Sequence, residues 1–254
     1  MIIIDKLAYS SSIRYFSPYI KVFFSIITLV CCVTSTSILF PLLMLAVMGG
    51  STIYYSAISI SKYIKLLYLP GSFIILSLIA IIFEISSVPM DFLAIDLGSV
   101  YLTASKANMV YAFQLSLKAF SGTSCLYFMT LTTPIIDFLE VLKRLHVPKF
   151  LIELMLLIYR FIFIIMENAL SMLQAQQCRM GHKNMRTSIT SMGNMLSVLL
   201  VKSYRRTDNL YNAMEARGYN GEFKFAVAFK RATLKQIIIF CVLQMFIIVM
   251  AILL

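Results

Sequence analysis

Five long apolar runs constrain the fold of this chain more than any other feature. A helix that crosses a bilayer needs roughly 20 predominantly apolar residues. The runs lie near residues 20–36, 38–55, 66–86, 107–131 and 236–254. Only 13% of the residues are charged and 60% are hydrophobic, which is unusual for a soluble domain. The sequence therefore predicts an all-α polytopic membrane protein with about five transmembrane helices.

The distribution of charge predicts the orientation of these helices. The segment 84–96 carries three carboxylates and no Lys or Arg, whereas Lys62 and Lys65 lie between the second and third apolar runs. Because cytoplasmic loops are enriched in Lys and Arg, we expect a cytoplasmic N-terminus and an external segment 87–103. From Lys143 to Lys235 there are 15 Lys and Arg against 5 Asp and Glu, so this stretch should be cytoplasmic. The C-terminus should then lie outside.

The segment 148–180 is apolar but has a regular polar stripe. Glu153, Arg160, Glu167 and Gln174 recur every seven residues, which returns to nearly the same face of a helix. Three charges in lipid would cost roughly 2.5–3.5 kcal/mol each. We therefore expect a long amphipathic helix that lies along the membrane. The alternative is a sixth, bundle-buried span over 150–173.

Two short signatures in the basic region each place an Arg close to a Gly. Arg179 and Gly181 follow the amphipathic helix, and Ala216, Arg217 and Gly218 follow another predicted helix. We expect both glycines to act as C-terminal caps. Arg presents a planar fork of donors that can pair with carboxylates, so each end could dock a partner. The alternative is that these arginines lie at the membrane interface and that the glycines only terminate helices.

The chain is predicted to be one domain over residues 1–254. Within it, residues 1–131 would hold four transmembrane helices, residues 132–230 the cytoplasmic helices, and residues 231–254 the last span. Lys118 is the one clear cation within a predicted span, and such a charge is either functional or satisfied by a headgroup or a bundle carbonyl.

The sequence lacks the motifs that nucleotide binding and metal binding require. No G-x-x-x-x-G-K-[ST] motif occurs, so the chain cannot build a P-loop, and no His, Cys and carboxylate cluster has the spacing of a metal site. We therefore expect no metal, no cofactor and no nucleic-acid partner. A secondary transporter would call for inverted repeats and broken helices, neither of which is visible, and a membrane enzyme would need a catalytic constellation.

The chain resembles the transmembrane T component of energy-coupling factor transporters, and within it the cobalt-transport branch named CbiQ. The resemblance extends over nearly the whole chain and is strongest toward the end of the cytoplasmic region. It rests on Ile4-Asp5-Lys6-Leu7-Ala8-Tyr9, Ser17-Pro18 and Lys21, Thr132-Thr133-Pro134, Leu145-His146-Val147-Pro148, Tyr159-Arg160-Phe161, Ala175-Gln176 with Arg179-x-Gly181, and Ser203-Tyr204-Arg205-Arg206 followed by Tyr211-x-Ala213-Met214-x-x-Arg217-Gly218-Tyr219-x-Gly221.

This resemblance implies a coupling role without bond chemistry. T components join a substrate-binding membrane subunit, CbiM-like in the cobalt branch, to two ABC-type ATPases that use the ATP. Arg179 and Gly181 would form the first ATPase-coupling end, and Ala216, Arg217 and Gly218 the second. The first end departs from the Ala-Arg-Gly pattern, and Lys118 stands where Arg is expected. The resemblance implies the cell membrane of a prokaryote as the location, and a shared T component for vitamin uptake is the alternative.

Overall fold

A computed structural model describes residues 3–82, 84–86, 93–96, 101–104, 106–219 and 234–253. The described part is dominated by helices, as the all-α prediction requires. The helices are α1 (Ile3–Ser10), α2 (Pro18–Thr34), α3 (Leu39–Ser56), α4 (Ile60–Ile82), α5 (Lys106–Thr132), α6 (Ile135–Arg144), α7 (Lys149–Cys178), α8 (Met185–Glu215) and α9 (Leu234–Leu253).

The chain divides into two compact units. One unit comprises residues 2–138 and 228–254, and the other comprises residues 139–227 with Met1. We call them the apolar unit and the coupling unit. Apart from Met1, the coupling unit falls within the region 132–230 that the sequence assigns to cytoplasmic helices. The assignment of residues 1–254 to a single domain stays a prediction.

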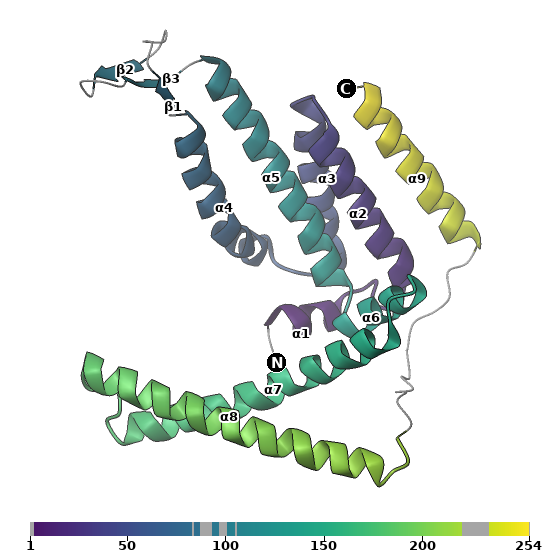
Figure 1. Ribbon diagram of the computed structural model, residues 1–254. Coiled ribbons are helices and arrows are strands. Elements are labelled where there is room, and N and C mark those ends of the chain that lie inside the picture. The colour runs from purple at the N-terminus through teal and green to yellow at the C-terminus, as the bar shows by residue number, and fades with distance from the viewer. Residues whose placement is uncertain are drawn as a thin grey trace. The chain divides into compact units, whose positions relative to one another are not determined.

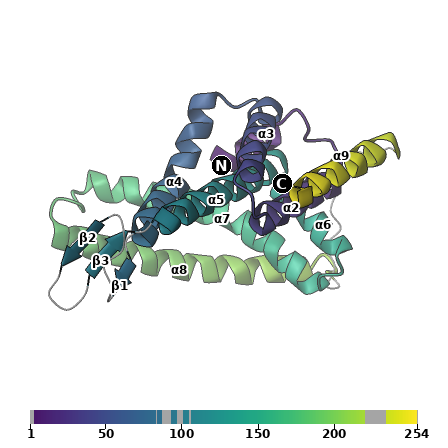
Figure 2. The same ribbon diagram turned by 90° about the horizontal axis from the view of Figure 1, so that it is seen from above.

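In the apolar unit, α5 is the central helix. It packs against α2, α3 and α4, and α9 packs against α2. Figure 1 shows these helices side by side, and the view from above in Figure 2 shows α5 between α4, α3 and α2. The fourth predicted span is therefore the helix that organises the bundle.

The core of the apolar unit is formed where α2, α3, α5 and α9 meet. Its buried members are Cys32, Phe40, Met44, Met48, Cys125, Phe128 and Ile247. Small and hydroxylated residues let the helices approach closely, as is common in membrane bundles. Ser25 donates a hydrogen bond to the Cys125 carbonyl over 2.7 Å, and the Tyr63 and Ser124 hydroxyls lie 2.8 Å apart.

The helices of the apolar unit correspond to the predicted spans, but they begin and end at different residues. By length and composition, α3 and α4 can each cross a membrane, and α5 with α6 forms a third, bent candidate. The bend between the two helices is 103° and falls at Thr133 and Pro134. Helix α2 and the Phe240–Ala251 part of α9 are shorter apolar helices. The chain is thus a membrane protein, and the number of five spans stays a prediction.

A small sheet that the apolar pattern did not predict follows α4. Strands β1 (Glu84–Ser86), β2 (Leu93–Asp96) and β3 (Tyr101–Ala104) pair antiparallel in the order β1-β3-β2. The predicted third span, 66–86, therefore ends too late, since α4 stops at Ile82 and β1 begins at Glu84. Strand pairing supplies hydrogen-bond partners to backbone groups that follow α4. A pattern of apolar residues alone does not reveal such pairing.

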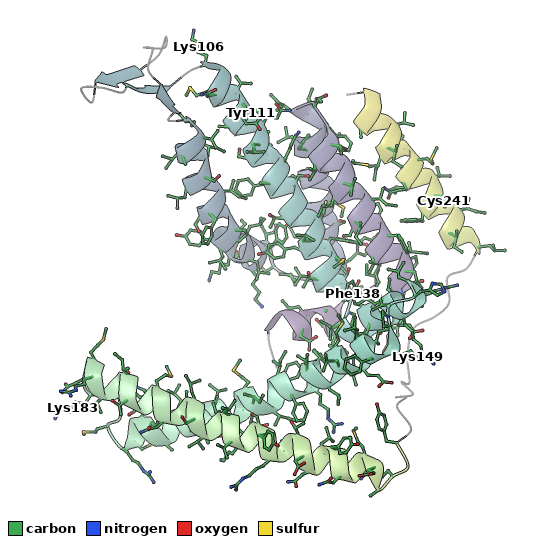
Figure 3. All side chains as sticks on the ribbon, viewed as in Figure 1. Lys106, Tyr111, Phe138, Lys149, Lys183 and Cys241 are labelled. Atoms are coloured by element: carbon green, nitrogen blue, oxygen red, sulfur yellow. The ribbon has the colours of Figure 1, made fainter. Side chains whose placement is uncertain are left out.

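The coupling unit is built on α7 and α8. Each is a continuous helix of about the predicted length, and the two pack against each other as a crossed pair. Lys183 lies in the turn that joins them, and Lys149 lies at the start of α7 (Figure 3). On α7, Glu153 is half-buried, whereas Arg160 and Glu167 are exposed. The placement of α7 along the membrane rather than across it stays a prediction.

Labelling of single cysteines should reveal the predicted orientation. We expect a membrane-impermeant maleimide added outside to react with S99C, which lies outside the described residues, and to spare S188C on α8. The background should carry C178S and C241A, because only these native cysteines are exposed. Reaction of S188C from outside, before the membrane is permeabilised, would contradict the orientation derived from the charge asymmetry.

Candidate functional site: two helix ends that carry arginine

The first candidate end closes α7 with a Schellman motif. The amide of Gly181 donates to the Gln176 carbonyl over 2.8 Å, and the amide of Met180 donates to the Gln177 carbonyl over 3.0 Å. These two bonds satisfy carbonyls that the helix itself leaves without donors. Arg179 occupies the position between the helix and the left-handed residue, and its side chain is exposed.

The second candidate end closes α8 in the same way. The amide of Tyr219 donates to the Met214 carbonyl over 3.0 Å, and the amide of Gly218 donates to the Glu215 carbonyl over 2.9 Å. Arg217 is exposed and takes the position in this motif that Arg179 takes in the first. The structure therefore makes the two arginines geometrically equivalent, which the sequence spacing alone could not establish.

The two glycines, however, are not equivalent. The left-handed residue is Gly218 at the second end, with φ 73°, but Met180 at the first end, with φ 55°. The prediction that Gly181 supplies the left-handed cap is therefore wrong by one residue. Gly181 is needed for space, because a Cβ there would lie 2.9 Å from Ser191 Oγ and 3.0 Å from the Gln176 carbonyl oxygen.

This difference predicts opposite responses to substitution. Gly218→Ala should cost about 1–2 kcal/mol through left-handed strain, and Gly218→Asn should cost less because Asn tolerates that conformation. At position 181 Asn should destabilise the protein more than Ala, because Asn is larger and the space beside Gly181 is filled. Thermal unfolding of the four variants in detergent checks this order. A milder effect of Asn than Ala at position 181 would contradict the packing role.

Side chains of α8 hold the first end in place. Gln176 Nε2 donates to the Ser191 carbonyl over 2.7 Å, and Ser191 Oγ donates to the Gly181 carbonyl over 2.9 Å. His182 Nδ1 lies 2.9 Å from Ser188 Oγ. The sequence analysis missed both serines, because nothing in their spacing shows that α8 folds back on the end of α7.

A side chain of α7 holds the second end. The Tyr219 hydroxyl donates to Glu153 Oε2 over 2.7 Å, which ties the residue after Gly218 to the first turns of α7. Accepting this hydrogen bond, the Glu153 carboxylate raises the pKa of Tyr219 above its ordinary value. Glu153 was noticed as one member of a polar stripe, but its partner was not predicted. Each end is thus braced by the opposite helix.

Ala216 lies on the exposed surface at the last turn of α8. Its amide donates to the Asn212 carbonyl over 3.0 Å, so it continues the helix up to Arg217. The small side chain leaves the arginine accessible to a partner. Of the five predicted coupling residues, Arg179, Ala216, Arg217 and Gly218 are exposed and Gly181 is half-buried.

Lys118 contacts a backbone carbonyl. Its Nζ lies 3.3 Å from the Val33 oxygen in the last turn of α2, and nearby Gln114 Nε2 donates to the Thr36 carbonyl over 2.5 Å. A cation at a helix C-terminus complements the macrodipole. This contact is the structural alternative named above, and a separate functional role for Lys118 stays a prediction.

Lys21 is a buried cation whose contacts no local pattern in the sequence predicts. It is 3% exposed, and its Nζ donates to the Thr132 carbonyl over 2.8 Å and to the Ile13 carbonyl over 3.2 Å. Thr132 is the last residue of α5, just before the bend. Lys21 thus fixes the end of α5.

No group of three or more His, Cys, Asp or Glu side chains that could hold a metal ion occurs within the described ranges. The arrangement suits contact with a partner rather than bond chemistry. Two exposed cations lie at braced helix ends. Such ends can accept carboxylates or carbonyls from another protein.

Comparison with known protein families agrees with the resemblance found in the sequence. The family model for CbiQ, described as cobalt transport protein, matches residues 9–227. The cobalt transport protein CbiQ of Salmonella typhimurium is 26% identical over 70% of this chain and 80% of its own. The putative fused cobalt transport protein CbiMQ of Methanocorpusculum labreanum is 28% identical over 86% of this chain and 37% of the fused protein.

A third relative comes from the wider group. The energy-coupling factor transporter transmembrane protein EcfT of Lactococcus lactis is 38% identical over 47% of this chain and 48% of its own. The match to the CbiQ model extends over most of the chain and includes both helix ends and helices α2 to α8. The chain therefore belongs to the CbiQ cobalt transport protein family.

Proposed function

We propose that this chain is the membrane coupling subunit of an energy-coupling factor importer that takes up cobalt ions. In this proposal two ABC-type ATPases bind the ends of α7 and α8, and a CbiM-like membrane subunit binds the substrate. ATP binding and hydrolysis occur in the partners, so the chain itself is not an enzyme and needs no cofactor. It resides in the cell membrane with its N-terminus in the cytoplasm.

The observation that carries this proposal is the equivalence of the two helix ends. Arg179 and Arg217 occupy the same position in two Schellman motifs, and both are exposed. Two equivalent ends are what a pair of related ATPase subunits would require. Because α7 and α8 are continuous and braced by Tyr219 and Ser191, a displacement of either end would be transmitted along a stiff helix.

The names of the relatives support the choice of substrate and partner. Two of them are cobalt transport proteins, and one joins CbiM and CbiQ names in a single chain. The similarity to EcfT supports the second candidate, a T component shared among vitamin-binding subunits. Cobalt is preferred because the family model carries that description, and because the two cobalt transport relatives align over 225 and 180 residues whereas EcfT aligns over 131.

Purification of the tagged chain from cells that also express its genomic neighbours tests the proposal. We expect two ATPase subunits and one further membrane subunit to copurify, and we expect uptake of radioactive cobalt that stops when ATP is depleted. The uptake assay should include nickel and a vitamin. Vitamin uptake without cobalt uptake would favour the shared T component, and purification without any ATPase would refute the coupling role.

A further inference from the structure

The structure contains a cavity of about 400 Å³ between α7 and α8, wholly within the coupling unit. Its lining residues lie near the middle of α7 and in the second half of α8. The α7 side contributes apolar side chains and the α8 side contributes cations. The residues that matter here are Phe161, Ile164 and Ile165 on α7 and Lys202, Arg205 and Arg206 on α8.

The cavity is strongly electropositive on its α8 side. Three cations line it, and no Asp or Glu is among its described lining residues. Asn168 Nδ2 is engaged by the Ile164 carbonyl of its own helix over 2.9 Å, whereas Lys202, Arg205 and Arg206 are exposed. Arginine forks bind phosphate oxygens with paired, charge-assisted hydrogen bonds. The polar side of the cavity is therefore suited to a phosphate group.

Exposed apolar side chains lie close in sequence to the residues that line the cavity. Ile158 and Met166 on α7 are 50% and 49% exposed, and Leu196 and Leu200 on α8 are 59% and 74% exposed. Exposed apolar side chains at this density on a helix pair mark a surface that binds a membrane or another protein. A ligand seated in the cavity would have apolar surface on one side and cations on the other.

We infer that this cavity holds the headgroup of an anionic phospholipid. Its phosphate binds Lys202, Arg205 and Arg206, and its glycerol and upper acyl chains lie against Phe161, Ile164 and Ile165. A free phosphate would leave the apolar side unused, and an acidic protein segment would need a longer groove than a cavity of this size. Basic pockets between helices on the cytoplasmic side are a common way to bind such headgroups.

Lipid binding to the full-length chain alone tests the inference without any ATPase, so its outcome is independent of the proposed coupling role. The chain is purified in detergent and titrated with phosphatidylglycerol or phosphatidylcholine, and bound lipid is counted by native mass spectrometry. We expect preferential retention of phosphatidylglycerol. We expect R205Q/R206Q to weaken that binding by about fivefold or more, since two arginine contacts to phosphate are lost.

The matched control is K183Q/R186Q, which removes two charges from exposed positions in the same unit but outside the cavity. It should retain phosphatidylglycerol, and R205K/R206K should recover part of the binding. An equal loss in the control variant would overturn the inference, because it would show nonspecific attraction. Equal retention of both lipids, or displacement of the lipid by inorganic phosphate at similar concentration, would also overturn it. So would an acidic protein that copurifies in place of lipid.

Discussion

Replacing Arg179 and Arg217 together by Glu is expected to release both ATPase subunits and to abolish substrate uptake. Each arginine is exposed at the same position of a braced helix end, where its fork can bind more than one acceptor. Charge reversal turns attraction into repulsion and leaves the acceptor without its partner. Truncating one member of a buried charge pair typically costs about 2–5 kcal/mol in binding. Pull-down of the ATPases, with uptake assayed alongside, measures both effects.

Further variants separate the motif from the general charge of the region. R160E/R186E reverses two exposed arginines on α7 and α8 outside the closing motifs and should retain the ATPases. R179K/R217K should be milder than the Glu variant but not neutral, because Lys keeps the charge and loses the fork. Protein level should be unchanged in all three. If the double Glu variant still holds both ATPases and supports uptake, the two motifs only terminate helices.

The helices themselves could be predicted from sequence because their signals are local. Apolar runs indicated α2 to α5 and α9. Pro134 and Pro148 directly precede α6 and α7, as is typical of proline at the start of a helix. The seven-residue recurrence of polar residues correctly indicated that α7 is one long helix with a polar stripe. These signals depend on residues within one or two turns, so they need no knowledge of the tertiary structure.

The detail of the candidate site depends on contacts that are distant in sequence. Gly181 looked like a cap because Gly favours left-handed backbone, yet Met180 takes that conformation and Gly181 makes room for Ser191. The link from Tyr219 to Glu153 joins residues 66 positions apart. No local pattern contains this information. The motif predicted where the ends lie, but the fold determines how they are held.

The two lysines that contact backbone carbonyls show the same limit. Sequence drew attention to Lys118, within a predicted span, and left a carbonyl contact open as one of two alternatives there. It assigned no structural role to Lys21, at the start of the first predicted span. The structure buries Lys21 more deeply, against a carbonyl 111 positions away at the end of α5. A cation near the start of a span is expected to reach the interface. Here the bend after Thr132 leaves the Thr132 carbonyl without a helical donor, and Lys21 bonds to it instead.

Lys21→Met is expected to lower the stability of the apolar unit substantially. Methionine fills a similar volume but cannot donate, so the Thr132 carbonyl loses its bond of 2.8 Å, whereas the Ile13 carbonyl keeps the bond of 3.0 Å that it accepts from the Phe16 amide. A buried carbonyl left without a donor costs about 1–3 kcal/mol. The end of α5 would also lose the cation that complements its macrodipole. The expected result is a fall in midpoint temperature of unfolding, larger than that caused by Lys118→Met.

The reactivity of buried cysteines measures the unfolding temperature of these variants. Cys32 and Cys125 are 0% exposed and become reactive only when the bundle opens, so a thiol-reactive dye reports unfolding on heating in detergent. C178S/C241A removes the exposed thiols from the background. Lys62→Met changes an exposed cation on α4 and is the matched control. Lys118 is half-buried and has one carbonyl contact at 3.3 Å, so its variant should fall between the two. If Lys21→Met unfolds at the same temperature as Lys62→Met, the buried lysine does not hold the end of α5, and the bend must be fixed by Thr133 and Pro134 alone.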